Sequence, residues 1–161
     1  MHPPRVSGFS YKGLHRYFLT FCAFGRSRPF ESRDIVHSVL GQIRRSAASE
    51  QFDLLAYCFM PDHLHLVVTG LTETADLRRF ARDARQRSGY WFSRRTGRRL
   101  WQTGFYDRVL RSEEQTLPVI RYVLANAVRA GLAAEIGEFE FSGSDVFSID
   151  EICACLQTWA P

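Results

Sequence analysis

The spacing of apolar residues predicts strands and helices that alternate through the first half of the chain. Tyr17–Phe24 is rich in aromatic residues and predicts a strand. From Ser32 to about Ser46 the apolar residues recur at helical spacing, with Ser32 in the N-cap position. Phe52–Phe59 is a short apolar run that stops before Pro61-Asp62, and His63–Val68 then predicts the next strand.

The second half of the chain continues this alternation and ends in a third helix. A helix is predicted from Asp76 to about Ser93, followed by a basic turn over Arg94–Arg99 and an extended segment over Leu100–Leu110. Thr116 to about Ala130 predicts the last helix, and Gly131 follows it as a C-terminal cap. This order of elements is typical of an α+β fold in which helices cover a small antiparallel sheet.

The length and composition are those of one globular domain. The 161 residues are 45% hydrophobic and 24% charged, without a repeat, a low-complexity tract or a long linker. A (β/α)₈ barrel is excluded because it needs about 250 residues. We expect a single domain over residues 1–161, with a loose N-terminus at 1–13. The tail at 145–161 is expected to form a short helix, either packed on the body or covering a DNA groove.

The cysteine and hydropathy patterns indicate a cytoplasmic protein. The four cysteines lack the spacing of a zinc knuckle, and nothing in the sequence demands disulfides. The apolar segment Tyr17–Gly25 is followed at once by arginines, which argues against a signal peptide. Because no apolar run approaches the roughly 18 residues of a membrane span, we expect no membrane partner.

Positive charge is concentrated in one part of the chain. The net charge is +4, and Lys12 is the only lysine. Between Arg78 and Arg111 there are eleven arginines and only two aspartates, a local net charge of +9. Guanidinium groups bind phosphate well, so the pattern favours nucleic-acid binding, although arginine codon preference in a GC-rich genome would also raise the arginine content. The arginines that we expect to contact DNA are Arg78, Arg79, Arg82, Arg85, Arg94, Arg95, Arg98 and Arg99.

The segment Trp101–Arg111 interleaves aromatic residues with arginines. Single-strand binders use this combination to stack bases on rings and to hold the backbone with guanidinium groups. Trp101 is therefore a further candidate for DNA binding. The same pattern also suits an edge strand whose aromatic residues belong to the core.

Two histidines are the first candidates for chemistry. On a strand, His63 and His65 project to the same face about 6.7 Å apart, while Leu64 and Leu66 project to the other. Two neutral imidazoles that converge in this way can begin a metal site, although such pairs are often only structural.

A tyrosine and an amide on the last predicted helix are the second candidates. Tyr122 and Asn126 are four residues apart, so they lie on one face of the helix. Such a phenol and amide could meet a metal-bound phosphate. The alternative is a half-buried tyrosine beside an ordinary surface asparagine.

Five blocks of the sequence, taken together, resemble the REP-associated tyrosine transposases, a branch of the HUH single-tyrosine transposases. They are YFLTF at Tyr17–Phe21, MPDHLHLVV at Met60–Val68, WQTGFYDRVLR at Trp101–Arg111, RYVLANAVRAGL at Arg121–Leu132 and FEFSGS at Phe139–Ser144. The resemblance extends from about Ser7 to Ser144. The histidine block together with the Tyr-x-x-x-Asn helix is far more specific than either alone.

The resemblance implies a fold, a chemistry and a substrate. The fold would be a ferredoxin-like antiparallel sheet with helices packed on it. His63, His65 and Asn126 would bind a divalent metal, Mg²⁺ or Mn²⁺, and Tyr122 would cleave and rejoin single-stranded DNA through a 5′-phosphotyrosine. The substrate would be a palindromic repeat that folds as a hairpin. The chain departs from the family pattern at Ala127, where proline is common, and at Asp62, where asparagine is common.

Two other functions remain compatible with these residues. One is a non-catalytic hairpin-binding protein on the same scaffold, and the other is a metal-dependent hydrolase that uses water as the nucleophile. The sequence leaves the oligomeric state open between a monomer and a homodimer. Tyr106 also lies near basic residues, but no amide or histidine follows it by one helical turn or one strand step.

Overall fold

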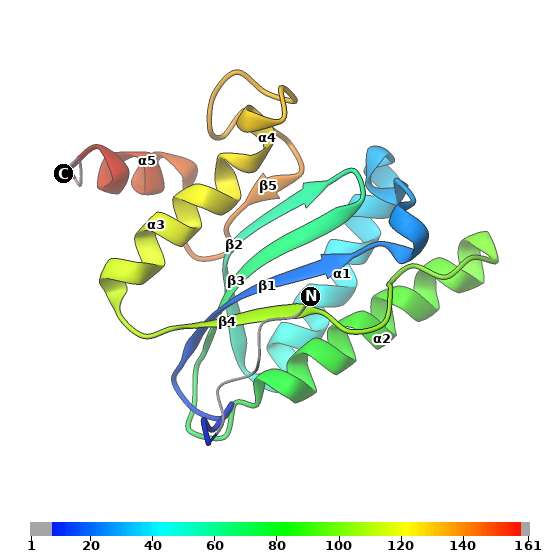
Figure 1. The fold of residues 1–161 in the computed structure, drawn as a ribbon, viewed down its shortest axis with the longest axis horizontal. Helices are drawn as coiled ribbons and strands as arrows, with labels where there is room; N and C mark the ends of the chain where they lie inside the picture. The colour runs from blue at the N-terminus through cyan, green and yellow to red at the C-terminus, as the bar shows by residue number, and fades with distance from the viewer. Residues whose placement is uncertain (1–7, 159–161) are drawn as a thin grey trace.

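The computed structural model describes residues 8–158 and contains a five-stranded antiparallel sheet with helices on both faces (Figure 1). The strands are β1 (Arg16–Cys22), β2 (Phe52–Met60), β3 (His63–Gly70), β4 (Tyr106–Leu110) and β5 (Ser142–Gly143). Their order across the sheet is β4-β1-β3-β2-β5, and each pair of neighbours is antiparallel. The first four strands have the ferredoxin-like order, which confirms the α+β fold class expected from the sequence.

The helices divide between the two faces of the sheet. They are α1 (Arg33–Glu50), α2 (Leu77–Thr96), α3 (Glu113–Leu124), α4 (Asn126–Arg129) and α5 (Ile149–Thr158), with 3₁₀ turns η1 (Phe24–Arg26) and η2 (Pro29–Glu31) before α1. Figure 1 shows α1 and α2 side by side on one face and α3 on the other side of the sheet. None of the helices in the described range is long and apolar enough to cross a membrane.

The alternation of side chains along the strands separates two apolar cores. Leu64 and Leu66 of β3 are fully buried in the larger core, between the sheet and the α1–α2 layer. Val67 points the other way and packs with Val123 and Leu124 of α3 in the smaller core. The histidines of β3 therefore lie on the face that α3 covers, as the strand period predicts.

The helix predicted over 76–93 begins where expected but ends later. The helix predicted from Asp76 does begin there, since the Asp76 carboxylate accepts hydrogen bonds from the backbone N–H groups of Arg78 and Arg79. It continues through Thr96 and ends at Gly97, whose φ is +70°. The first half of the predicted basic turn is therefore helical. Within the predicted extended segment 100–110, only Tyr106–Leu110 forms a strand.

The last predicted helix begins earlier than expected and is interrupted. Ser112 accepts a hydrogen bond from the backbone N–H of Gln115, so α3 begins at Glu113 and not at Thr116. It ends at Leu124, and α4 continues the chain from Asn126. Gly131 ends α4 as expected, with φ +72° and the hydrogen bonds of a Schellman motif.

Both ends of the described chain pack on the domain. Tyr11 is buried against the ring of Tyr17, and the backbone N–H of Gly13 donates to the carbonyl of Ala75. The expectation of a loose N-terminus is therefore wrong for Tyr11–Gly13, and residues 1–7 lie outside the described range. At the other end, Ile152 of α5 is buried in the smaller core, so the described part of the tail packs on the body.

Gly70 offers a direct test of the packing beside β3. A Cβ atom there would lie 2.2 Å from the carbonyl oxygen of Gly13 and 3.1 Å from Cβ of Ala75. We expect Gly70→Ala to lower the free energy of unfolding by about 1–3 kcal/mol, because backbone atoms must move. Gly41 in α1 is the matched control, since a Cβ meets nothing within 4 Å. Gly41→Ala should instead raise stability by up to about 1 kcal/mol. Urea unfolding measures both, and equal effects would contradict the packing.

Candidate active site

Two imidazoles and one phenol come together on the face of the sheet that α3 covers. His63 and His65 project from β3 with their ring centroids 4.7 Å apart. Tyr122, in the last turn of α3, places its ring centroid 5.9 Å from that of His65. The strand period brings the two histidines together, whereas the packing of α3 on the sheet brings the tyrosine to them.

Each imidazole uses Nδ1 for a hydrogen bond within the protein. His63 Nδ1 donates to Oδ1 of Asp62 at 2.6 Å. His65 Nδ1 is hydrogen-bonded at 2.9 Å to the hydroxyl of Thr20, which lies opposite it on β1. Nε2 of each ring has no hydrogen-bond partner within residues 8–158. Metal-binding histidines typically use one nitrogen for such an orienting bond and the other for the metal, so this pair fits a divalent cation.

The electrostatics of the site also suit a pair of metal ligands. Burial, helped by electrostatic interactions with His63 and Arg129, lowers the pKa of His65 to about 3. The ring is therefore neutral at physiological pH, which a metal ligand must be. Partial burial opposes ionisation of Asp62, but its hydrogen bond with His63 and its electrostatic interactions with His63 and Arg26 outweigh burial and lower the pKa of Asp62.

Tyr122 is held on several sides yet remains accessible. Its side chain is 42% exposed, and its ring meets Phe18 edge to face at 5.9 Å. The guanidinium carbon of Arg129 lies 4.3 Å from the ring centroid. The phenol is thus oriented by the sheet and by α4 while the side chain stays partly exposed to solvent.

The side chain of Asn126 forms hydrogen bonds with the last turn of α3 in this structure. Its Nδ2 donates to the carbonyls of Tyr122 at 2.8 Å and Val123 at 3.3 Å, and its Oδ1 accepts from Arg129 at 3.0 Å. A metal ion that used this oxygen would share it with the guanidinium of Arg129 or displace that group. Within the described range, no group of three or more His, Cys, Asp and Glu side chains could hold a metal. Two imidazoles would therefore be joined by oxygen donors such as an amide, water or phosphate.

The arginines expected to bind DNA differ in whether their side chains contact other parts of the fold. Arg85 donates to the backbone carbonyl of Gln102 and lies against two phenylalanine rings, and Arg99 donates to the carbonyl of Trp101 and the hydroxyl of Thr103. Arg79 forms an ion pair with Glu50, and Arg78 lies over the ring of Tyr11. These four side chains are thus partly or wholly engaged in the fold. Arg82, Arg94 and Arg95 are exposed on α2, and Arg98 is exposed in the segment that follows it.

The structure corrects the assignment of Trp101. Its side chain is only 5% exposed and packs against the rings of Phe21 and Phe30. Its indole N–H donates to the hydroxyl of Ser88 on α2 at 2.9 Å. Trp101 is therefore a core residue with no ring face available for a base, which is the edge-strand alternative that the sequence left open.

Three residues of the site are missed by sequence reasoning. Asp62 is adjacent to His63 and could have been suspected from that position. Thr20 is 45 residues from His65, and only the pairing of β1 with β3 joins them. Arg129 reaches Tyr122 across the break between α3 and α4, which the helix pattern does not reveal.

The H-x-H strand of a ferredoxin-like sheet thus faces a helix that carries an accessible tyrosine. The chain belongs to the IS200-like transposase family, whose family model matches residues 12–126. The family is one of DNA-cleaving and strand-transfer enzymes.

Solved structures resemble this chain as well. One is a REP-associated tyrosine transposase bound to a REP hairpin, at 19% sequence identity and a TM-score of 0.70, covering 88% of this chain and 82% of that one. Another is a candidate transposase from Deinococcus radiodurans R1, at 19% identity and a TM-score of 0.53, covering 76% of this chain and 95% of that one. At this identity the likeness concerns the fold. A comparison with curated proteins finds no match.

Proposed function

We propose that this transposase cleaves and rejoins single-stranded DNA through a covalent bond to Tyr122, with a divalent cation bound at His63 and His65. One observation carries the proposal. Two imidazoles with their Nδ1 atoms engaged and their Nε2 atoms available lie beside an accessible phenol, with His65 and Tyr122 in ring contact at 5.9 Å. A structural histidine pair would not require an exposed tyrosine at this position.

The chemistry follows from the residues present. The hydroxyl oxygen of Tyr122 attacks the phosphorus of a phosphodiester and loses its proton to solvent, while the bond to the 3′ oxygen breaks and that oxygen takes up a proton. The products are a 5′-phosphotyrosine and a free 3′-OH. Because the new bond is itself a phosphodiester, the 3′-OH of a second strand can reverse the attack and join the strands. A cation, Mg²⁺ or Mn²⁺, held by His63 and His65 would polarise the phosphate and stabilise the departing oxygen.

The protein's contribution is to orient the reacting groups. Phe18 and His65 contact the Tyr122 ring from the sheet, and Arg129 lies over it from α4. These contacts restrict the phenol to one side of the histidine pair, which lowers the entropic cost of reaching the attack geometry. The substrate class is proposed by analogy with the structural relative that is bound to a REP hairpin.

The proposal is tested with single-stranded oligonucleotides that contain hairpin-forming palindromes flanking the gene. The protein is incubated with the DNA and Mn²⁺ or Mg²⁺, and the products are separated on a denaturing gel. A protein–DNA band that disappears with chelator supports covalent, metal-dependent cleavage. Salt-sensitive binding without a band would instead support the non-catalytic hairpin binder.

The exposed arginines of α2 and of the segment just after it should make DNA binding depend steeply on salt. Arg82, Arg94 and Arg98 make no side-chain hydrogen bond or ion pair to another described residue, so their charge is available to phosphate. We expect each substitution by alanine to weaken hairpin binding and to reduce the slope of log K against log salt by about 1. Fluorescence anisotropy over a salt series measures this slope. Arg45→Ala, at an exposed position of α1, is the control, and an equal change in that variant would refute a specific role for α2.

A further inference from the structure

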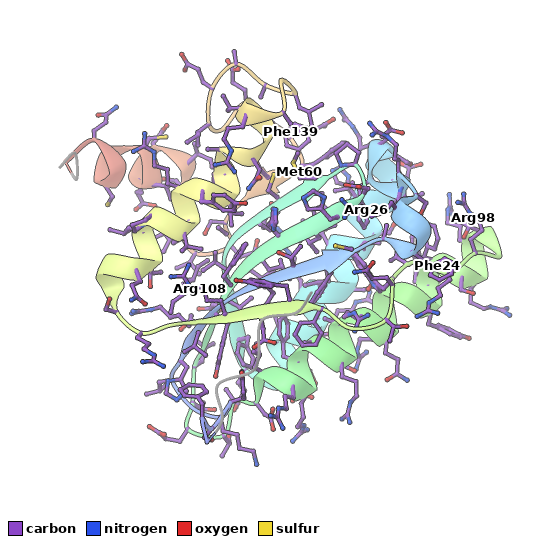
Figure 2. The ribbon with its side chains drawn as sticks, viewed as in Figure 1. Phe24, Arg26, Met60, Arg98, Arg108 and Phe139 are labelled. Carbon is purple, nitrogen blue, oxygen red and sulfur yellow. The ribbon has the colours of Figure 1, made fainter. Side chains whose placement is uncertain are left out.

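A chain of polar contacts leads to His63 from the connection between β1 and α1. Nε of Arg26, in η1, lies 3.2 Å from Oδ2 of Asp62. The other oxygen of Asp62, Oδ1, accepts the 2.6 Å hydrogen bond from Nδ1 of His63. Figure 2 labels Arg26 beside the turn between β2 and β3, just beyond Met60. The carboxylate is thus shared between a guanidinium and an imidazole, with one oxygen for each.

The backbone around this chain of contacts is firmly held. The N–H of Ala23 donates to the carbonyl of Asp62 at 2.9 Å, and the N–H of Phe30 donates to the carbonyl of Pro61 at 3.2 Å. The two loops are therefore tied together on either side of Arg26. Arg26 itself has a φ of +54°, a left-handed conformation that costs a non-glycine residue of order 1 kcal/mol or more. Such strain persists only where the surroundings hold it, and here it accompanies a side chain directed to the site.

We propose that Asp62, held by Arg26, is a positioning residue that fixes the ring orientation and tautomer of His63. A carboxylate only accepts hydrogen bonds, so the proton of a neutral His63 must lie on Nδ1. Nε2 is then the unprotonated nitrogen and can donate its lone pair to a cation. The inference rests on the proposed metal site, but it concerns which residues orient the ring of His63 in the metal-free protein.

The contacts of position 62 require a carboxylate, because this side chain accepts from both His63 and Arg26. Asparagine at position 62 could accept from His63 through its amide oxygen, but its NH₂ group would then face the guanidinium of Arg26. Two sets of donors cannot bond each other. The carboxylate of Asp62 satisfies both neighbours, so Asp62 and Arg26 are expected to act as a pair.

The first test reads the tautomer of His63 by ¹⁵N NMR, in metal-free protein at a pH where the ring is neutral. We expect the wild type to show a single tautomer protonated at Nδ1. Asp62→Ala should shift His63 to the mixture that an unrestrained imidazole adopts. Asp62→Asn should lower the share of the Nδ1–H form, because an amide whose oxygen accepts from Arg26 donates to an unprotonated Nδ1. A merely structural role for Asp62 would leave the tautomer unchanged in both variants, which would overturn the proposal.

The second test measures Mn²⁺ affinity by electron paramagnetic resonance. Loss of an orienting partner should weaken Mn²⁺ binding by about 10- to 100-fold in Asp62→Ala and by less in Arg26→Ala. Arg28→Ala is the matched control, because Arg28 pairs with Glu31 in the same connection and not with Asp62. Thermal melts of each variant show whether the fold is intact. Equal weakening in Arg26→Ala and Arg28→Ala would contradict the pairing of Arg26 with Asp62.

Failure of this inference can be told apart from failure of the proposed function. If His63→Ala and His65→Ala leave Mn²⁺ binding unchanged, the metal site itself is wrong. If those variants lose Mn²⁺ but Asp62→Ala retains both the affinity and the Nδ1–H tautomer, the site stands and the positioning role is refuted.

Discussion

Replacing Tyr122 with phenylalanine is expected to abolish the covalent protein–DNA product, with a fall of at least about 10³-fold in its rate of formation. The substitution removes one oxygen atom and keeps the ring. The contacts of that ring with Phe18, His65 and Arg129 should therefore remain, and so should the fold. Hairpin binding is expected to change little, because the loss concerns only the attacking atom. Denaturing gels measure the covalent product, and fluorescence anisotropy measures binding.

Tyr106 provides the matched control for this experiment. Its ring also contacts Phe18, at 5.9 Å, and it lies on β4, next to β1 in the sheet. Tyr106→Phe should form the covalent product at close to the wild-type rate. A product lost in Tyr106→Phe but kept in Tyr122→Phe would move the nucleophile to β4. Cleaved DNA without a protein adduct, still made by Tyr122→Phe, would indicate water as the nucleophile and support the hydrolase alternative.

Removing both imidazoles is expected to cause the second large loss. The variant His63→Ala/His65→Ala should not bind Mn²⁺ measurably and should form the covalent product at least about 10²-fold more slowly, since charge stabilisation by a cation is worth several kcal/mol. Adding metal should then no longer accelerate the reaction. Titration of Mn²⁺ with and without DNA checks the first expectation, and the denaturing gel checks the second.

Controls separate this loss from a general effect of changing histidines. His37 is exposed on α1, away from the site, so His37→Ala should behave as the wild type. His65 is 7% exposed, so replacing it with alanine leaves a cavity between β3 and α3. His63 is less buried, so His63→Ala alone tests the metal site if the double variant is destabilised. Undiminished metal-dependent cleavage by a folded His63→Ala would refute the assignment.

Much of the site is encoded in local sequence patterns. The period of a strand places His63 and His65 on one face and Leu64 and Leu66 on the other, and the structure confirms this division. The spacing of four residues puts Tyr122 and Asn126 one turn apart, where the amide of Asn126 now bonds the carbonyl of Tyr122. The order of strands and helices also identified the α+β class. Each of these results depends on residues that are near one another in the chain.

The sequence by itself therefore determined the kinds of element, their order and the two groups that could carry chemistry. Only the tertiary structure decided which side chains surround those groups. Thr20 supports His65 through a strand pairing across 45 residues, and Arg26 reaches Asp62 from another loop. The tertiary structure also shows that Trp101 is buried in the core and that Arg85 donates to the backbone carbonyl of Gln102. The physical reason is that periodicity reports which face a residue occupies, whereas burial and hydrogen-bond partners depend on what packs against that face.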